Sequence, residues 1–128
     1  MKRLLSLLIL AFAANAGAQS TACYPGALDL VPFTKESKTV STASVSLTAA
    51  TYAPTDGPRA AAAMITVGAQ PVRVWFDGTD PTSTVGHYFA ANTIINVCQN
   101  TIALLRAIRD TSATGDAIFS VTYSRPPQ

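Results

Sequence analysis

A short stretch of the chain contains four polar residues of types that can do chemistry: Asp77, Asp80, Ser83 and His87. In a hydrolase, His87 would be a general base oriented by one aspartate, with Ser83 or Thr84 as the nucleophile. A turn this short does not force that geometry, however. Aspartates in turns ordinarily accept backbone N–H bonds. We therefore expect turn residues here, no catalytic residue, and a protein that is not an enzyme.

The same two aspartates, Asp77 and Asp80, are the candidate ligands for a metal, in this case calcium. Calcium takes six or more oxygen ligands, so most of the shell would have to come from elsewhere in the chain. No glycine-rich phosphate loop or Cys/His zinc spacing is present, and Glu36 is the only glutamate. The sequence accordingly predicts no cofactor and no metal.

Trp75, the only tryptophan, offers a different chemistry. On the outer face of a strand its ring would stack flat on a sugar, and Tyr88 or Tyr123 would extend that surface. A single tryptophan in a small domain is also a typical core residue. Both interpretations stay open, and carbohydrate binding through Trp75 is the alternative function.

Alternation of residue types predicts the strands that would position these side chains. In the run 72–76, Val72, Val74 and Phe76 face one side, whereas Arg73 and Trp75 face the other. The aspartates and His87 follow in a turn and the next strand. Three arginines are expected as solvated charges at strand edges: Arg73, Arg106 and Arg109.

Similar patterns, separated by turns rich in Gly, Pro and Asp, predict strands at 39–47, 60–67, 87–89, 93–97, 102–108 and 117–124. The runs 60–67 and 102–108 also fit short helices, but their length and surroundings favour strands. Seven or eight short antiparallel strands indicate an all-β sandwich, immunoglobulin-like or jelly-roll-like. The expected core residues are Trp75, Phe76, Phe89, Ile95, Leu104, Ile108, Phe119 and Val121.

The first eighteen residues have the layout of a signal peptide. Lys2 and Arg3 precede an apolar run that is too short to span a membrane, and Ala16-Gly17-Ala18 provides a cleavage site. We expect signal peptide 1–18, an arm or leading strand 19–38, and a sandwich domain 39–125. The product would be periplasmic or extracellular, with no membrane contact after signal removal.

Composition allows one domain and excludes several partners. The 128 residues are 48% hydrophobic and 12% charged. Two of the nine Lys and Arg lie in the expected signal, so seven remain against seven Asp and Glu. A neutral chain has no charge footprint for nucleic acid.

Several segments together resemble a family of small virion-associated proteins of tailed phages and prophages, which have no established activity. They are Ser46–Tyr52, Ala63–Val67, Val72–His87 with its block Asp-Gly-Thr-Asp-Pro-Thr-Ser-Thr-Val-Gly-His, Leu104–Arg109 and Ile118–Tyr123. The resemblance implies a structural or assembly role, with self-association or other protein subunits as partners, and a virion location if the gene belongs to a phage. The signal peptide departs from that family and implies an exported protein that keeps the domain. A shorter likeness, Phe76–Thr82, is similar to a turn in immunoglobulin-like domains of chitobiase-type enzymes and supports the sandwich only.

Two cysteines, Cys23 and Cys98, lie in the expected mature chain. Export to an oxidising compartment favours a disulfide between them, which would tie the N-terminal arm to the domain. Two separate buried thiols are the alternative. Lipidation of Cys23 is disfavoured, because no large aliphatic residue stands three positions before it.

We expect the exported protein to lack two hydrogen atoms relative to its reduced mass, because Cys23 and Cys98 form a disulfide. Peptide mapping without reductant should yield one crosslinked peptide containing both cysteines. Two thiols that can be alkylated in the unfolded, unreduced protein would contradict the bond.

Overall fold

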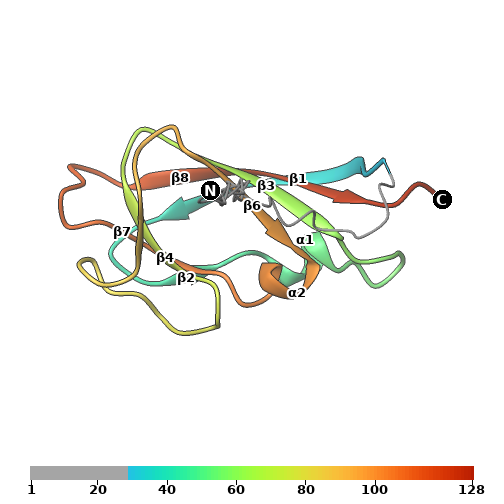
Figure 1. The fold of residues 1–128 in the computed structure, drawn as a ribbon, viewed down its shortest axis with the longest axis horizontal. Coiled ribbons are helices and arrows are strands. Elements are labelled where there is room, and N and C mark those ends of the chain that lie inside the picture. Colours follow the sequence, from blue (N-terminus) through green and yellow to red (C-terminus); the bar gives the residue numbers. More distant parts are fainter. Residues whose placement is uncertain (1–28) are drawn as a thin grey trace, which may run out of the picture.

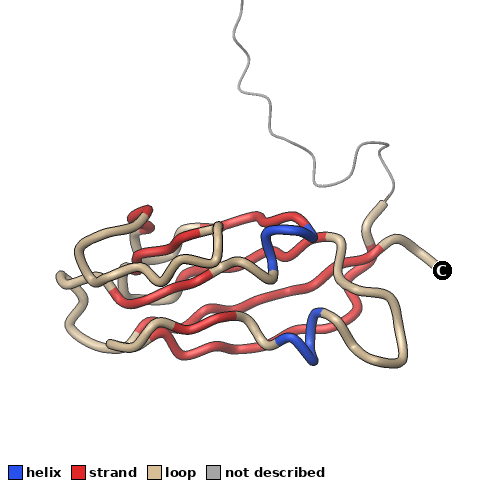
Figure 2. Tube along the Cα trace, turned by 90° about the horizontal axis from the view of Figure 1, so that it is seen from below, coloured by secondary structure: helices blue, strands red, loops and turns tan. Residues whose placement is uncertain are grey.

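Two four-stranded antiparallel sheets, packed face to face, make up the described part of the chain, residues 29–128 of a computed structural model (Figure 1). The first sheet has the order β1 (Val31–Val40), β8 (Ala117–Arg125), β3 (Ala62–Val67) and β6 (Ile94–Cys98). The second has the order β2 (Val45–Ser46), β7 (Arg106–Arg109), β4 (Val72–Trp75) and β5 (His87–Phe89). Seen from the side, the strands lie in two layers (Figure 2). The all-β sandwich expected from the sequence is confirmed.

Two single-turn helices, α1 (Ala49–Tyr52) and α2 (Gln99–Ile102), connect strands of different sheets. The strand predicted at 102–108 is wrong in its first half. Ile102 ends α2, and β7 begins only at Arg106. The long strand β1 crosses the expected domain boundary at residue 38. The expected signal peptide and residues 19–28 of the expected arm lie outside the described residues.

The central strand β8 shows why these residues form a sheet. Its even and odd positions point to opposite faces: Phe119, Val121 and Tyr123 are buried, whereas Ile118 and Ser120 are exposed. On one side β8 pairs with the whole length of β1, and on the other with β3. The first and last strands of the described chain therefore lie side by side in the first sheet.

The core lies between the sheets and consists of aliphatic side chains from both, with Phe119 and Tyr123 among the largest. The expected core members Ile95, Ile108, Phe119 and Val121 are buried. Leu104 is a correction, because it lies exposed in the turn after α2. Three expected aromatic members are only partly buried: Trp75, Phe76 and Phe89.

No helix in the described part of the chain is long and apolar enough to cross a membrane.

Replacing Ile65 by alanine should lower the free energy of unfolding by about 2–5 kcal/mol, because this fully buried side chain leaves a cavity between the sheets. The matched control is Ile118→Ala, on the exposed face of the neighbouring strand, which should cost less than about 1 kcal/mol. Urea denaturation followed by circular dichroism measures both. Equal losses would contradict the assignment of the two faces.

Candidate interaction surfaces

The polar stretch singled out in the sequence forms a loop, residues 76–86, between β4 and β5. Asp77 accepts a hydrogen bond from the backbone N–H of Thr79 at 2.9 Å, which lowers the pKa of Asp77. Asp80 accepts one from the Ser44 hydroxyl at 2.8 Å and lies 3.7 Å from the Nε of Arg106. Both aspartates therefore hold the loop in place, as expected for turn residues.

The last residues of the loop pack against β4. Pro81 is buried, and Gly86 adopts a left-handed φ of 134°. A Cβ at Gly86 would come within 3.1 Å of the Pro81 Cβ and 3.3 Å of the Arg73 Cβ. Glycine is needed here both for the backbone conformation and for the close approach.

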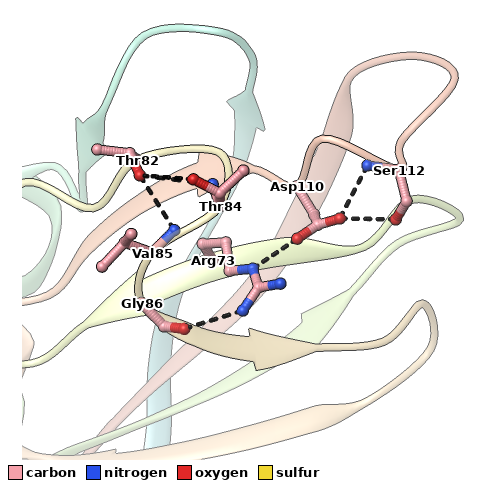
Figure 3. Close-up of polar contacts among 7 residues, drawn as sticks. All are labelled: Arg73, Thr82, Thr84, Val85, Gly86, Asp110 and Ser112. Atoms are coloured by element: carbon pink, nitrogen blue, oxygen red, sulfur yellow. Dashed lines mark hydrogen bonds and ion pairs between the residues drawn. The ribbon is translucent and has the colours of Figure 1, made fainter.

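An ion pair between Arg73 and Asp110 anchors this region (Figure 3). The Nε of Arg73 donates to Asp110 Oδ2 at 2.5 Å, and its Nη1 donates to the carbonyl of Gly86 at 3.2 Å. The other Asp110 oxygen accepts from the backbone N–H of Ser112 at 2.8 Å and from its hydroxyl at 2.6 Å. The network thus joins β4, the loop and the turn after β7.

Asp110 is the one buried charged side chain among the described residues, with 3% of its surface exposed. The two hydrogen bonds from Ser112 lower its pKa, burial opposes them, and Arg73 lowers it further. All of its partners favour the charged form, so the group is a structural anion and not a proton donor or acceptor at neutral pH.

The arginines are therefore not the solvated edge charges that the sequence suggested. Each is partly buried and paired with a carboxylate: Arg73 with Asp110, Arg106 with Asp80, and Arg109 with Asp116. Sequence reasoning missed this because each pair joins residues on different strands or turns.

The hydrolase geometry is not formed. His87 contacts rings, with its centroid 4.9 Å from that of Trp75 and 5.8 Å from that of Phe76. Within residues 29–128, no hydrogen bond joins His87 to Ser83 or Thr84. Nor does that part of the chain contain a group of three or more His, Cys, Asp or Glu able to hold a metal.

The three expected sugar-stacking residues do not form one platform. Trp75 is half-buried, with its ring edge-on to His87 at an interplanar angle of 76°. Tyr88 is half exposed, and the Arg73 guanidinium lies 5.0 Å from its ring centre. Tyr123 belongs to the core of the other sheet, fully buried, so its ring is not available to a ligand.

The hydroxyl of Tyr123 donates to Glu36 on β1, which also accepts the backbone N–H of Thr48 at 3.1 Å. Burial raises the pKa of Tyr123, and its bond to Glu36 raises it further. For Glu36, burial raises the pKa, but the hydrogen bonds from Thr48 and Tyr123 outweigh it and the net shift is downward. This carboxylate ties the edge strand to the start of α1.

The outer face of the first sheet is a surface that sequence reasoning did not identify. Its side chains are Lys35, Ser37 and Thr39 on β1, Ile118, Ser120 and Thr122 on β8, Met64 and Thr66 on β3, and Ile94 and Asn96 on β6. Only Lys35 is charged. Alternation indicates the outward residues of each strand, but the strand order that brings them together is not visible in the sequence.

Comparisons of the chain with protein family models, curated proteins and solved structures found no match. The resemblance to phage proteins therefore stays an expectation. The disulfide also stays a prediction: Cys98 ends β6, but Cys23 lies outside the described residues.

Replacing Asp110 by alanine should lower the free energy of unfolding by about 2–3 kcal/mol, because Arg73 and both donors of Ser112 lose their partner. The native pKa of Asp110 is lowered, so its contribution is complete above its unfolded pKa near 4 and is lost as the pH falls further. The variant should therefore lose less stability on acidification than the parent protein. Urea denaturation at neutral and acidic pH measures both effects.

The matched control is Asp116→Ala, which breaks the exposed pair with Arg109 and should cost less than about 1 kcal/mol. An Asp110 variant as stable as this control, with an unchanged acid dependence, would refute the structural role of the network.

Proposed function

We propose that the protein is a non-enzymatic assembly module that acts after export and docks on copies of itself through the outer face of the first sheet. The observation that carries this proposal is a nearly uncharged, four-stranded surface with large apolar side chains at its centre and margin. Ile94, Ile118 and Met64 are 57%, 48% and 47% exposed. Burying such groups is favourable by about 25 cal/mol per Å² of apolar surface.

Charge supports a second copy as the partner. Lys35 is the one charged side chain of this face and lies on its edge strand, β1. A two-fold axis parallel to the strands, midway between β1 and β6, would place β1 of each copy opposite β6 of the other and keep the two lysines on opposite margins. No like charges then oppose one another, and no foreign charge is needed to complement the surface.

The size of the face supports a weak contact. Strands lie about 4.8 Å apart with a rise of about 3.3 Å per residue, so four strands of about six residues present on the order of 400 Å². Stable complexes bury about 800 Å² per partner, so this contact alone would form only at high protein concentration.

The outer face of the second sheet is less suited to docking. The loop 76–86 is tied to it through Arg73 and Arg106, and their ion pairs with Asp110 and Asp80 already use its charged groups. Carbohydrate binding gains little support there, because Trp75 is half-buried and edge-on to His87. The resemblance to virion-associated proteins is in keeping with assembly and adds no catalytic residue.

The weight-average mass of the protein should rise with concentration in sedimentation equilibrium. In the double variant Met64→Lys/Ile118→Lys the mass should rise less than in the parent over the same range, because two charges on each copy would be buried in the face contact. The matched control is Val85→Lys/Leu104→Lys, which changes two exposed apolar residues away from this face and should associate like the parent.

A parent protein that stays monomeric at millimolar concentration would refute the proposal. Association as strong in Met64→Lys/Ile118→Lys as in the parent, or weakened equally in the control, would place the contact elsewhere.

A further inference from the structure

Four strands form the edges of the two sheets in the described part of the chain, and three of these edges are protected against pairing with another chain. β2 and β5 have only two and three residues. The ten-residue strand β1 contains Pro32, an irregularity between Pro32 and Thr34, and inward-pointing Glu36 and Lys38. Short length, proline, bulges and inward charges are the usual means by which proteins block edge pairing.

Within residues 29–128, the fourth edge, β6, lacks these features. Its sequence, Ile-Ile-Asn-Val-Cys, has no proline, glycine or charge. In the whole chain, no Asp, Glu, Lys or Arg occurs between Asp80 and Arg106. An uncharged edge strand with three β-branched residues, Ile94, Ile95 and Val97, presents a template for another strand.

The hydrogen bonds of β6 show which backbone groups face outward. The carbonyl of Thr93 accepts from Val67 N–H at 2.8 Å, and the N–H of Gln99 donates to Ala61 at 2.9 Å. In an antiparallel ladder the groups facing one partner alternate, so the odd-numbered residues bond to β3. The N–H and carbonyl groups of Ile94 and Asn96 therefore face away from the sheet.

We propose that β6 pairs antiparallel with β6 of a second copy, with Ile94 of each chain opposite Asn96 of the other around a two-fold axis at Ile95. The outward backbone groups of both residues would then be satisfied in each copy. The two first sheets would become one continuous sheet, and their outer faces would continue into one another.

A second copy fits this edge better than a foreign strand with charged residues. Like charges directly opposite each other destabilise a strand pair, and β6 opposed to itself brings no charges together. This inference rests on the proposed function in taking self-association as the role, but it uses the edge of the sheet and not its face.

The test is amide hydrogen exchange of the full processed protein, measured residue by residue by NMR as a function of concentration. The amides of Ile94 and Asn96 should exchange about tenfold more slowly once most of the protein is associated, whereas those of β1 on its free edge should not change. In Met64→Lys/Ile118→Lys the face contact is lost, but the slowing at Ile94 and Asn96 should persist.

The variant Asn96→Pro removes one outward N–H and no bond to β3, a position at which an edge strand tolerates proline. It should abolish the slowing at Ile94, whereas Asn96→Thr, which keeps the N–H, should retain it. Circular dichroism checks that both variants keep the fold. If a variant does not fold, the exchange rates of Ile94 and Asn96 in the parent protein still test the edge pairing.

Two results would overturn the edge pairing. Ile94 and Asn96 amides that are protected equally at all concentrations would mean that the edge is covered within one chain. Amides that stay fast while the mass rises would locate association away from β6 and leave the face contact standing. A protein that never associates would refute both proposals.

Discussion

The packing of the inner side of β8 against the second sheet is the constraint on which the rest of the structure depends. Phe119, Val121 and Tyr123 supply much of the core volume, and each is almost completely buried. Because side chains alternate along a strand, burying these three fixes the opposite orientation for Ile118, Ser120 and Thr122. The residues that build the core thereby determine what the outer face presents to solvent.

Two carboxylates, Glu36 and Asp110, fix the positions of segments that lie outside the hydrophobic core. Glu36 links β1 to the start of α1 and to Tyr123. Asp110 links the turn after β7 to Arg73 on β4, and Arg73 in turn holds Gly86 at the end of the loop. Each buried carboxylate oxygen of Glu36 and Asp110 accepts a hydrogen bond, which offsets the free-energy cost of removing it from water. The two aspartates singled out in the sequence, Asp77 and Asp80, likewise hold the loop in place through their hydrogen bonds.

The sequence predicts the local structure well and the arrangement of its parts poorly. The strands at 72–76 and 117–124 follow from alternation alone, and the all-β sandwich follows from their number and spacing. The segment 102–108 misleads because the spacing of Ile102 and Leu105 fits a helical face, whereas Leu104, Arg106 and Ile108 alternate as in a strand. The chain changes from helix to strand between Ile102 and Arg106.

Long-range pairing accounts for what could not be predicted of the candidate surfaces. The sequence suggested Tyr123 as a ligand-binding ring. The pairing of β8 with β1 and the hydrogen bond to Glu36 instead hold Tyr123 in the core. The outer face combines residues from β1, β8, β3 and β6, an order that no local pattern contains. The sequence shows that residues 94–98 are uncharged, but only the strand order shows that they form an edge of the described sheet.

The outer face of the first sheet and the edge of β6 lie at right angles to each other, and in the proposed contacts each would pair with itself about a two-fold axis. One such contact closes into a dimer, whereas two different ones on the same subunit allow each dimer to recruit another, so assembly continues without a fixed end. Neither contact is strong alone, since the face covers on the order of 400 Å² and the edge adds a few backbone hydrogen bonds whose net worth is about 1 kcal/mol each. Growth therefore requires both contacts at once and a high local concentration. The chain expected after signal removal would have seven Lys and Arg against seven Asp and Glu, so copies of it would have no net charge repulsion to oppose assembly.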